Sequence, residues 1–155
     1  MGKRMNIEVV PVSDAIGAEI RGADLRLDLD DTTFATIHQA WNDHLILRIR
    51  DQDLTPAQLA AFSHRFGDLD PAPAGGDGIF HAEGNPEVLI LSNVLQGGKP
   101  IGALGFAEAK WHTDMSYYDI PPTASILYAV EVPEAGGHTG FCNMYTALET
   151  LPDDI

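Results

Sequence analysis

The sequence is poor in cysteine, in basic residues and in long apolar runs, and each shortage excludes a class of protein. Cys142 is the only cysteine among 155 residues, so an intrachain disulfide and a disulfide-stabilised secreted scaffold are both excluded. Lysine and arginine number 9 against 23 aspartates and glutamates, and the formal net charge of -14 opposes binding to nucleic acid or to an anionic membrane. No apolar run reaches the roughly 18 residues of a membrane-spanning helix.

The remaining composition is that of an ordinary globular protein. Apolar residues make up 45% and charged residues 21%, and 155 residues suit one domain. The N-terminus carries Lys3 and Arg4, but Glu8 and Asp14 interrupt any apolar core of a signal peptide. We therefore expect a cytoplasmic protein, and its acidic surface does not forbid a small anionic substrate held by a few local cations.

The first third of the chain alternates strand and helix patterns. β-branched and apolar residues predict strands over 7–12, 17–20 and 44–50. Apolar side chains at helical spacing predict a helix over 32–43, and Asp30 to Thr33 offer N-cap residues for it.

A second helix is predicted after Leu54, with Thr55 as N-cap and Pro56 at the first helical position. Gly67 is expected to end it. Its inner face would hold Leu59, Phe62, Ser63 and Phe66.

The rest of the chain predicts loops, short strands and one more helix. Glycine and proline predict loops over 68–84 and 96–110. Apolar runs predict strands, and Thr146 to Leu151 predict the start of a helix. The expected strands cover residues 88–91, 111–114, 125–130 and 139–143. The fold class is therefore expected to be α+β with a β-rich core.

The tetrapeptide from Trp111 to Asp114 is the strongest candidate for a functional site. In an extended strand, His112 and Asp114 would point to the same face. Two histidines and one carboxylate form the facial triad that binds non-haem Fe(II) and leaves positions open for cosubstrate and oxygen. The motif predicts two of these three ligands. A metal-dependent hydrolase could also use such a pair.

Several segments together resemble the taurine dioxygenase (TauD/TfdA-like) family of Fe(II)- and 2-oxoglutarate-dependent oxygenases, in the family's order and with similar gaps. The matching segments are Gly17 to Ile20, Leu47 to Thr55, Phe66-Gly67, His81 to Gly84, Trp111 to Asp114, Pro121-Pro122 and Gly136 to Thr139. A hydrolase would not explain the Pro-Pro and Gly-Gly-x-Thr segments. The resemblance implies a double-stranded β-helix, a jelly-roll variant, with flanking helices.

The resemblance also implies a reaction and roles for individual residues. The cofactors would be Fe(II), 2-oxoglutarate and O2, and a small, anionic substrate such as a sulfonate, sulfate ester or aryloxy acid would be hydroxylated with release of succinate and CO2. His112 and Asp114 match iron ligands, and Thr139 matches the residue whose hydroxyl contacts 2-oxoglutarate. The residues expected to line the substrate pocket are His81, Asn93, Met115 and Tyr117.

The chain departs from the family pattern in its second half. Family members are nearly twice as long, and their second histidine ligand and 2-oxoglutarate-binding arginine lie in the C-terminal half. Here no histidine follows Thr139 and no lysine or arginine follows Lys110. We expect residues 1–155 to be the N-terminal part of a single dioxygenase domain, because half a jelly roll would leave strand edges and apolar faces exposed. The alternative is a truncated or degenerate fragment without catalysis.

Four further residues carry specific expectations. His138 replaces an aspartate of the family and is expected to be an exposed turn residue. Ala72 stands near the position of a histidine that taurine-specific members use, which makes taurine a doubtful substrate. Trp111 and Cys142 are expected to be buried. Family members are commonly dimers or tetramers, so we expect a homo-oligomer.

Overall fold

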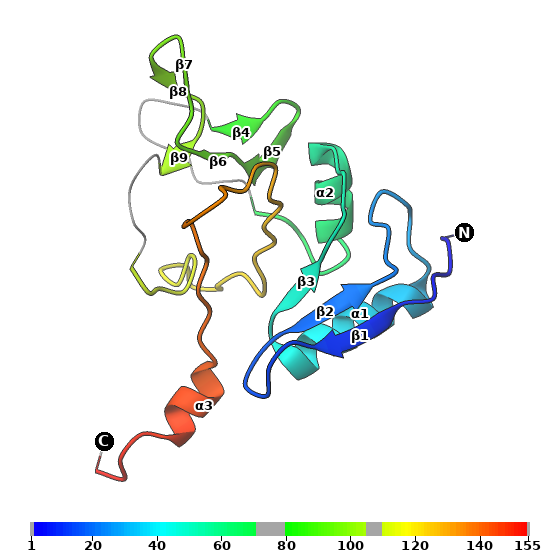
Figure 1. Ribbon diagram of the computed structural model, residues 1–155, viewed down its shortest axis with the longest axis vertical. Coiled ribbons are helices and arrows are strands. Elements are labelled where there is room, and N and C mark those ends of the chain that lie inside the picture. The colour runs from blue at the N-terminus through cyan, green and yellow to red at the C-terminus, as the bar shows by residue number, and fades with distance from the viewer. Residues whose placement is uncertain (1, 71–79, 105–109, 155) are drawn as a thin grey trace. The chain divides into compact units, whose positions relative to one another are not determined.

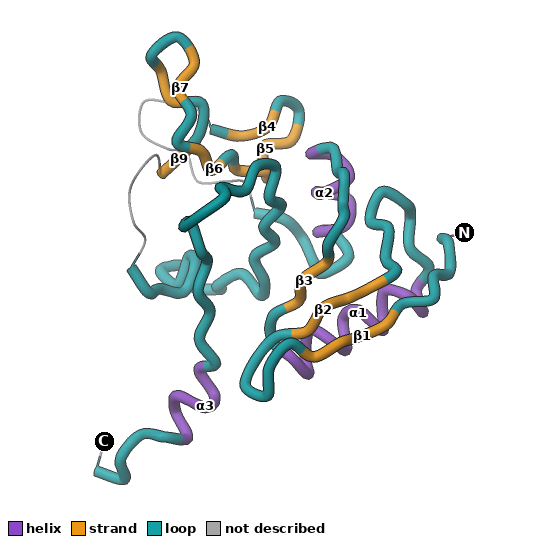
Figure 2. The backbone as a smooth tube through the Cα atoms, in the orientation of Figure 1, coloured by secondary structure: helices purple, strands orange, loops and turns teal. Residues whose placement is uncertain are grey.

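The computed structural model describes residues 2–70, 80–104 and 110–154, and its elements are drawn in Figures 1 and 2. The chain divides into two compact units. One unit combines Met1–Asp53 with Ala129–Ile155, and the other is Leu54–Tyr128. The polypeptide therefore leaves the first unit after Asp53 and returns to it at Ala129.

The first unit contains a three-stranded sheet built from the first 50 residues. Strand β1 (Glu8–Pro11) pairs antiparallel with β2 (Ala18–Arg21), and β2 pairs in parallel with β3 (Leu47–Ile49). A parallel pair needs a crossover connection, and helix α1 (Asp31–His44) provides it. These four elements confirm the predicted strands and the predicted helix, within a few residues at each end.

Helix α1 packs one face of this sheet. The Asp30 carboxylate caps the helix by accepting a hydrogen bond from the Thr33 amide at 2.7 Å. Ile37 of α1 and Ile20 of β2 are both fully buried, and α1 contacts both β2 and β3 (Figure 1). Burial of each isoleucine contributes roughly 1.5–3 kcal/mol, so this contact is the centre of the unit's core.

A buried carboxylate lies on the other face of the sheet. Strand alternation places Glu19 opposite its neighbours Ala18 and Ile20, and Glu19 is only 9% exposed. Its carboxylate accepts hydrogen bonds from Arg21 at 2.8 Å, Arg48 at 2.6 Å and Arg50 at 3.2 Å. These bonds, with that from Arg21 the largest cause, lower the pKa of Glu19 from its ordinary value of 4.5 to about 2.

The stability of the fold should therefore fall in acid in a way that depends on Glu19. A pKa that is lower in the folded than in the unfolded chain stabilises the fold above pH 4.5, and this stabilisation is lost as the pH falls toward about 2. Urea unfolding measured across this pH window should give a shallower pH dependence for Glu19→Gln than for wild type. Glu149→Gln, at an exposed position in the same unit, is the control and should keep the wild-type slope. Identical slopes for wild type and Glu19→Gln would contradict the argument.

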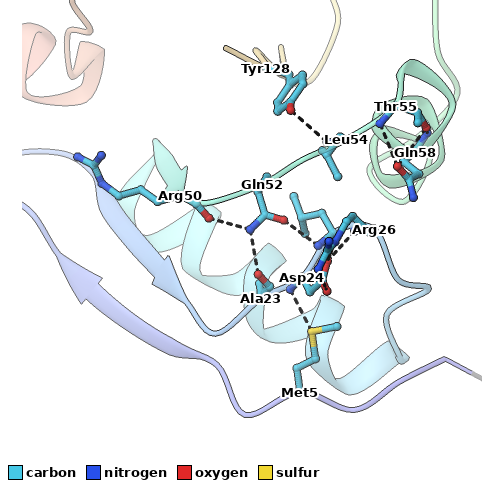
Figure 3. A network of polar contacts seen from close by, with 11 residues as sticks. Met5, Ala23, Asp24, Arg26, Arg50, Gln52, Leu54, Thr55, Gln58 and Tyr128 are labelled. Atoms are coloured by element: carbon cyan, nitrogen blue, oxygen red, sulfur yellow. Dashed lines mark hydrogen bonds and ion pairs between the residues drawn. The ribbon is translucent and has the colours of Figure 1, made fainter. Parts of the chain in front are cut away.

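The Gln52 side chain joins the segment after β3 to the loop after β2 (Figure 3). Its amide nitrogen donates to the carbonyls of Ala23 at 3.0 Å and Arg50 at 2.8 Å, and its oxygen accepts from the Leu25 amide at 2.9 Å. Leu25 is buried beside this contact. The loop that leads into α1 is thus held by these side-chain bonds and by a backbone bridge between Lys3 and Leu29.

The second unit begins with helix α2 (Pro56–Ser63), which packs against strand β5 (Asn85–Leu89). Thr55 and Gln58 form a reciprocal capping box at its N-terminus, which confirms the predicted helix start. Strand β4 (His81–Ala82) pairs antiparallel with β5. The apolar residues buried in this unit are Leu54, Ala60, Phe62 and Ala82.

Two further small sheets complete the second unit. Strand β6 (Leu91–Ser92) pairs in parallel with β9 (Ala103–Leu104), and β7 (Leu95–Gln96) forms a hairpin with β8 (Lys99–Pro100). Gly97 and Gly98 connect the hairpin with φ values of 58° and 79°, the left-handed conformation that such a two-residue turn requires. The predicted loops over 68–84 and 96–110 are therefore wrong where β4, β7, β8 and β9 lie.

Helix α3 (Met144–Glu149) is the last helix among the described residues. The Asn143 side chain caps this helix by accepting from the amides of Tyr145 and Thr146. Its amide nitrogen also donates to the Ala15 carbonyl at 2.8 Å, which joins α3 to the turn between β1 and β2. The predicted helix is confirmed and begins two residues earlier than expected.

The strands predicted over 111–114, 125–130 and 139–143 are wrong for the chain described. No strand is assigned anywhere from residue 110 to residue 154. A strand requires a neighbour whose amides and carbonyls pair with its own, and no such neighbour lies among the described residues. Apart from α3, residues 110–154 are irregular backbone with bends and turns. In the part of the chain that is described, no helix has the length and apolar character needed to cross a membrane.

Candidate metal centre

The side chains of His112 and Asp114 meet, although not by the predicted route. They lie in an irregular segment, and a turn follows in which the Tyr118 amide donates to the Met115 carbonyl at 3.1 Å. Met115 has a φ of 49°, which ends any extended backbone there. Nevertheless, His112 Nε2 lies 2.9 Å from Asp114 Oδ1. The predicted pairing of imidazole and carboxylate is present, without the predicted strand.

A backbone carbonyl sets the orientation of the His112 ring. Nδ1 lies 2.6 Å from the Lys110 carbonyl oxygen, which can only accept, so Nδ1 carries the hydrogen. Nε2 then faces the Asp114 carboxylate. The Lys110 carbonyl is the first cause, and Asp114 the second, of a raised pKa of His112. A cation at this position would replace the proton shared by Nε2 and Oδ1.

The second oxygen of Asp114 is also bound. Ser125 donates its hydroxyl to Asp114 Oδ2 at 2.9 Å. The side chains of His112 and Asp114 are 57% and 54% exposed, so a metal ion could reach their facing atoms. Sequence reasoning missed both Ser125 and the Lys110 carbonyl. Ser125 is 11 residues from Asp114 in sequence, and a main-chain carbonyl does not depend on residue type, so neither contact gives a recognisable sequence motif.

The donor atoms fit part of an Fe(II) site. Imidazole nitrogen and carboxylate oxygen are ligands that non-haem iron accepts. Within residues 2–70, 80–104 and 110–154, however, no group of three or more His, Cys, Asp or Glu residues could hold a metal. The structure thus brings together the two residues that the sequence predicted as metal ligands, and their role as ligands stays a prediction.

The other predicted site residues have no hydrogen bond or ion pair to the His112–Asp114 pair among the described residues. His81 is half-buried on β4, Asn93 is exposed just after β6, and Tyr117 is exposed with its ring 4.9 Å from that of Tyr118. Thr139 is exposed and belongs to the first unit, whereas the pair belongs to the second.

Two of the four specific expectations are wrong, one is confirmed, and one lies outside the described residues. Trp111 is 76% exposed and Cys142 is exposed, because the strands expected to bury them are not formed. His138 is exposed as expected. Ala72 lies in the segment 71–79, outside the described residues.

The fold and this pair define a class, an α+β protein with a candidate site for a metal that prefers nitrogen and oxygen ligands. Comparison with known proteins then gives the family. The model of the taurine catabolism dioxygenase TauD, TfdA family matches residues 8–155. The chain belongs to this family, as its sequence segments predicted.

Relatives in this family carry out named reactions. Pentalenolactone F synthase of Streptomyces avermitilis is 39% identical over 158 residues, which cover all of this chain and 50% of that protein. The alpha-ketoglutarate-dependent sulfate ester dioxygenase of Pseudomonas putida is 32% identical over 152 residues, covering 97% of this chain and 46% of that protein. The chain thus spans about half the length of these relatives.

A solved structure gives a similar result. A Burkholderia xenovorans protein assigned as an alpha-ketoglutarate-dependent taurine dioxygenase is 42% identical, with a TM-score of 0.51 over 59% of this chain and 32% of its own. The matched 59% of this chain thus resembles a region of that structure.

Proposed function

We propose that residues 1–155 form the N-terminal part of a single Fe(II)- and 2-oxoglutarate-dependent oxygenase domain, with a jelly-roll core. The observation that supports this most directly is the 2.9 Å approach of His112 Nε2 to Asp114 Oδ1 in a member of the TauD, TfdA family. When bound, iron with 2-oxoglutarate and O2 would supply the oxidising power that hydroxylates a C–H bond, releasing succinate and CO2.

The chain's own residues would bind and orient the reactants. His112 and Asp114 would hold the metal, and the Lys110 carbonyl would keep the imidazole aimed at it. Thr139 would contact the 2-oxoglutarate carboxylate. The residues proposed to line the substrate pocket are His81, Asn93, Met115 and Tyr117.

The proposed substrate is a small anionic molecule of the sulfonate, sulfate ester or aryloxy acid type. Relatives named for such compounds include the Pseudomonas putida sulfate ester dioxygenase and a (S)-phenoxypropionate/alpha-ketoglutarate-dioxygenase of Sphingobium herbicidovorans, which is 30% identical over 153 residues. The proposal further includes a cytoplasmic location and a homo-oligomeric state. Light scattering of the purified chain would test the oligomeric state.

The test of the function is an anaerobic titration with Fe(II) and 2-oxoglutarate. We expect the weak visible charge-transfer band of the iron–2-oxoglutarate chelate. On admission of oxygen, succinate should form faster in the presence of the correct member of a panel of sulfonates, sulfate esters and aryloxy acids. Absence of both the band and succinate from a longer form of the protein that carries a distal histidine and arginine would contradict the proposed function.

A second candidate is a non-catalytic fragment of such a domain. It is favoured by the absence, among the described residues, of a third His, Cys, Asp or Glu that could complete a metal site with His112 and Asp114. It predicts metal binding that depends on His112, without a 2-oxoglutarate band and without succinate. The same titration therefore separates the two candidates.

A further inference from the structure

Asp114 uses its two carboxylate oxygens differently. Oδ1 faces His112 Nε2 at 2.9 Å, and Oδ2 accepts the Ser125 hydroxyl at 2.9 Å. A carboxylate can only accept, so the serine must be the donor. The bond to Ser125 therefore fixes the rotation of the carboxylate and leaves Oδ1 directed at the histidine.

A hydrogen bond outside the metal centre anchors the segment that carries Ser125. The Tyr128 hydroxyl, three residues further along, accepts from the Leu54 amide at 3.0 Å, across 74 residues of sequence (Figure 3). Leu54 is buried at the N-terminal end of α2, next to the N-cap residue Thr55. Leu54 and Tyr128 are the two ends of the second unit. This bond therefore holds the segment that carries Ser125 to the start of helix α2.

The Ser125 side chain is expected to contribute little to the stability of the fold. It is exposed, in a run from Pro122 to Tyr128 in which half-buried and exposed residues alternate. An exposed hydroxyl can usually be removed with a change in stability within about 0.5 kcal/mol. Its contact with Asp114 thus points to a role in the metal centre.

We propose that Ser125 is a positioning residue that holds Asp114 as a single-oxygen metal ligand, with Oδ1 turned toward the site and Oδ2 held away from it. This inference rests on the proposed function. In a six-coordinate site with three protein ligands, a keto acid bound through two atoms and oxygen together need the other three positions. A carboxylate that bound through both oxygens would fill one of them. The hydrogen bond from Ser125 to Oδ2 keeps Oδ1 as the oxygen presented to the site.

The experiment is a titration of the full chain with Co(II) at neutral pH. Calorimetry and the visible absorption of the bound metal both measure the binding. Outer partners of metal ligands typically contribute about 10–100-fold to metal affinity, so Ser125→Ala should weaken Co(II) binding by about that factor. Ser125→Thr keeps the hydroxyl and should restore affinity. Thr123→Ala removes an exposed hydroxyl from the same segment and should bind as wild type does.

The outcomes separate this inference from the function on which it rests. If His112→Ala loses Co(II) binding while Ser125→Ala keeps wild-type affinity, Ser125 has no positioning role and the proposed function stands. If wild type binds no Co(II), or binds it equally without His112, both are overturned. If Ser125→Ala weakens binding only together with a lower melting temperature, and Ser125→Thr does not restore it, the role is structural and the inference fails.

Discussion

Replacing His112 by alanine is expected to weaken binding of Fe(II) or Co(II) by more than about 100-fold, since even outer partners of metal ligands contribute 10–100-fold. Its Nε2 is one of the two atoms that converge at 2.9 Å, and removal leaves Asp114 as a single carboxylate that is half exposed to water. One exposed carboxylate competes poorly with water for a divalent cation. The 2-oxoglutarate charge-transfer band should disappear with the metal. Anaerobic titration of both proteins measures this loss.

Matched histidines make this expectation specific. The chain has six histidines and a net charge of -14, so weak binding of cations to its acidic surface must be separated from binding at the site. His138→Ala and His64→Ala each remove one exposed imidazole and should leave the affinity unchanged. A loss of affinity in His138→Ala that equalled the loss in His112→Ala would assign the metal elsewhere and remove the main support for the proposed function.

The approach of His112 to Asp114 was predictable from the sequence, and the reason for its geometry was not. A His-x-Asp motif within a set of family segments was sufficient to select His112 and Asp114. The sequence argument used strand alternation, whereas in the structure a turn at Met115 follows the pair and the Lys110 carbonyl orients the ring. Main-chain acceptors and turn conformations do not depend on a recognisable side chain, which is why pattern reasoning could not find them.

Elements whose signals are local were predicted well. The Asp30 cap of α1 and the Thr55–Gln58 capping box of α2 act within a few residues, so the sequence contains the whole signal. Strands depend instead on a partner that is distant in sequence. The apolar runs over 125–130 and 139–143 have strand composition, yet they lack paired neighbours among the described residues and stay irregular.

Buried and exposed apolar side chains are also unevenly distributed along the sequence. Among the described residues, the buried apolar side chains all lie between Ala18 and Ala82. Large apolar side chains after residue 110 are mostly exposed. They include Trp111, Ile120, Leu127, Val130, Val132, Phe141, Met144, Tyr145, Leu148 and Leu151. The buried apolar side chains that stabilise each unit thus come from residues 18–82, whereas the proposed metal ligands lie after residue 110.

This difference in burial predicts that two similar substitutions in the first unit will lower the stability by very different amounts. Ile37 is 0% exposed in α1 and packs at the centre of the core, so Ile37→Ala should lower the free energy of unfolding by about 2–5 kcal/mol through lost burial and the cavity that remains. Leu148 is 67% exposed on α3, which buries none of its residues. Leu148→Ala removes the same number of carbon atoms and should change stability by no more than about 0.5 kcal/mol.

Urea unfolding followed by Trp41 fluorescence would measure both values. Trp41 lies on α1, in the unit that carries both substitutions, and a Trp111→Phe background removes the signal of the second unit. A small effect of Ile37→Ala would mean that α1 does not pack on the sheet as described. An effect of Leu148→Ala as large as that of Ile37→Ala would mean that the apolar face of α3 is covered in solution. Repeating the measurement at several protein concentrations would then show whether a second copy of the chain covers it, because only an intermolecular contact makes stability depend on concentration.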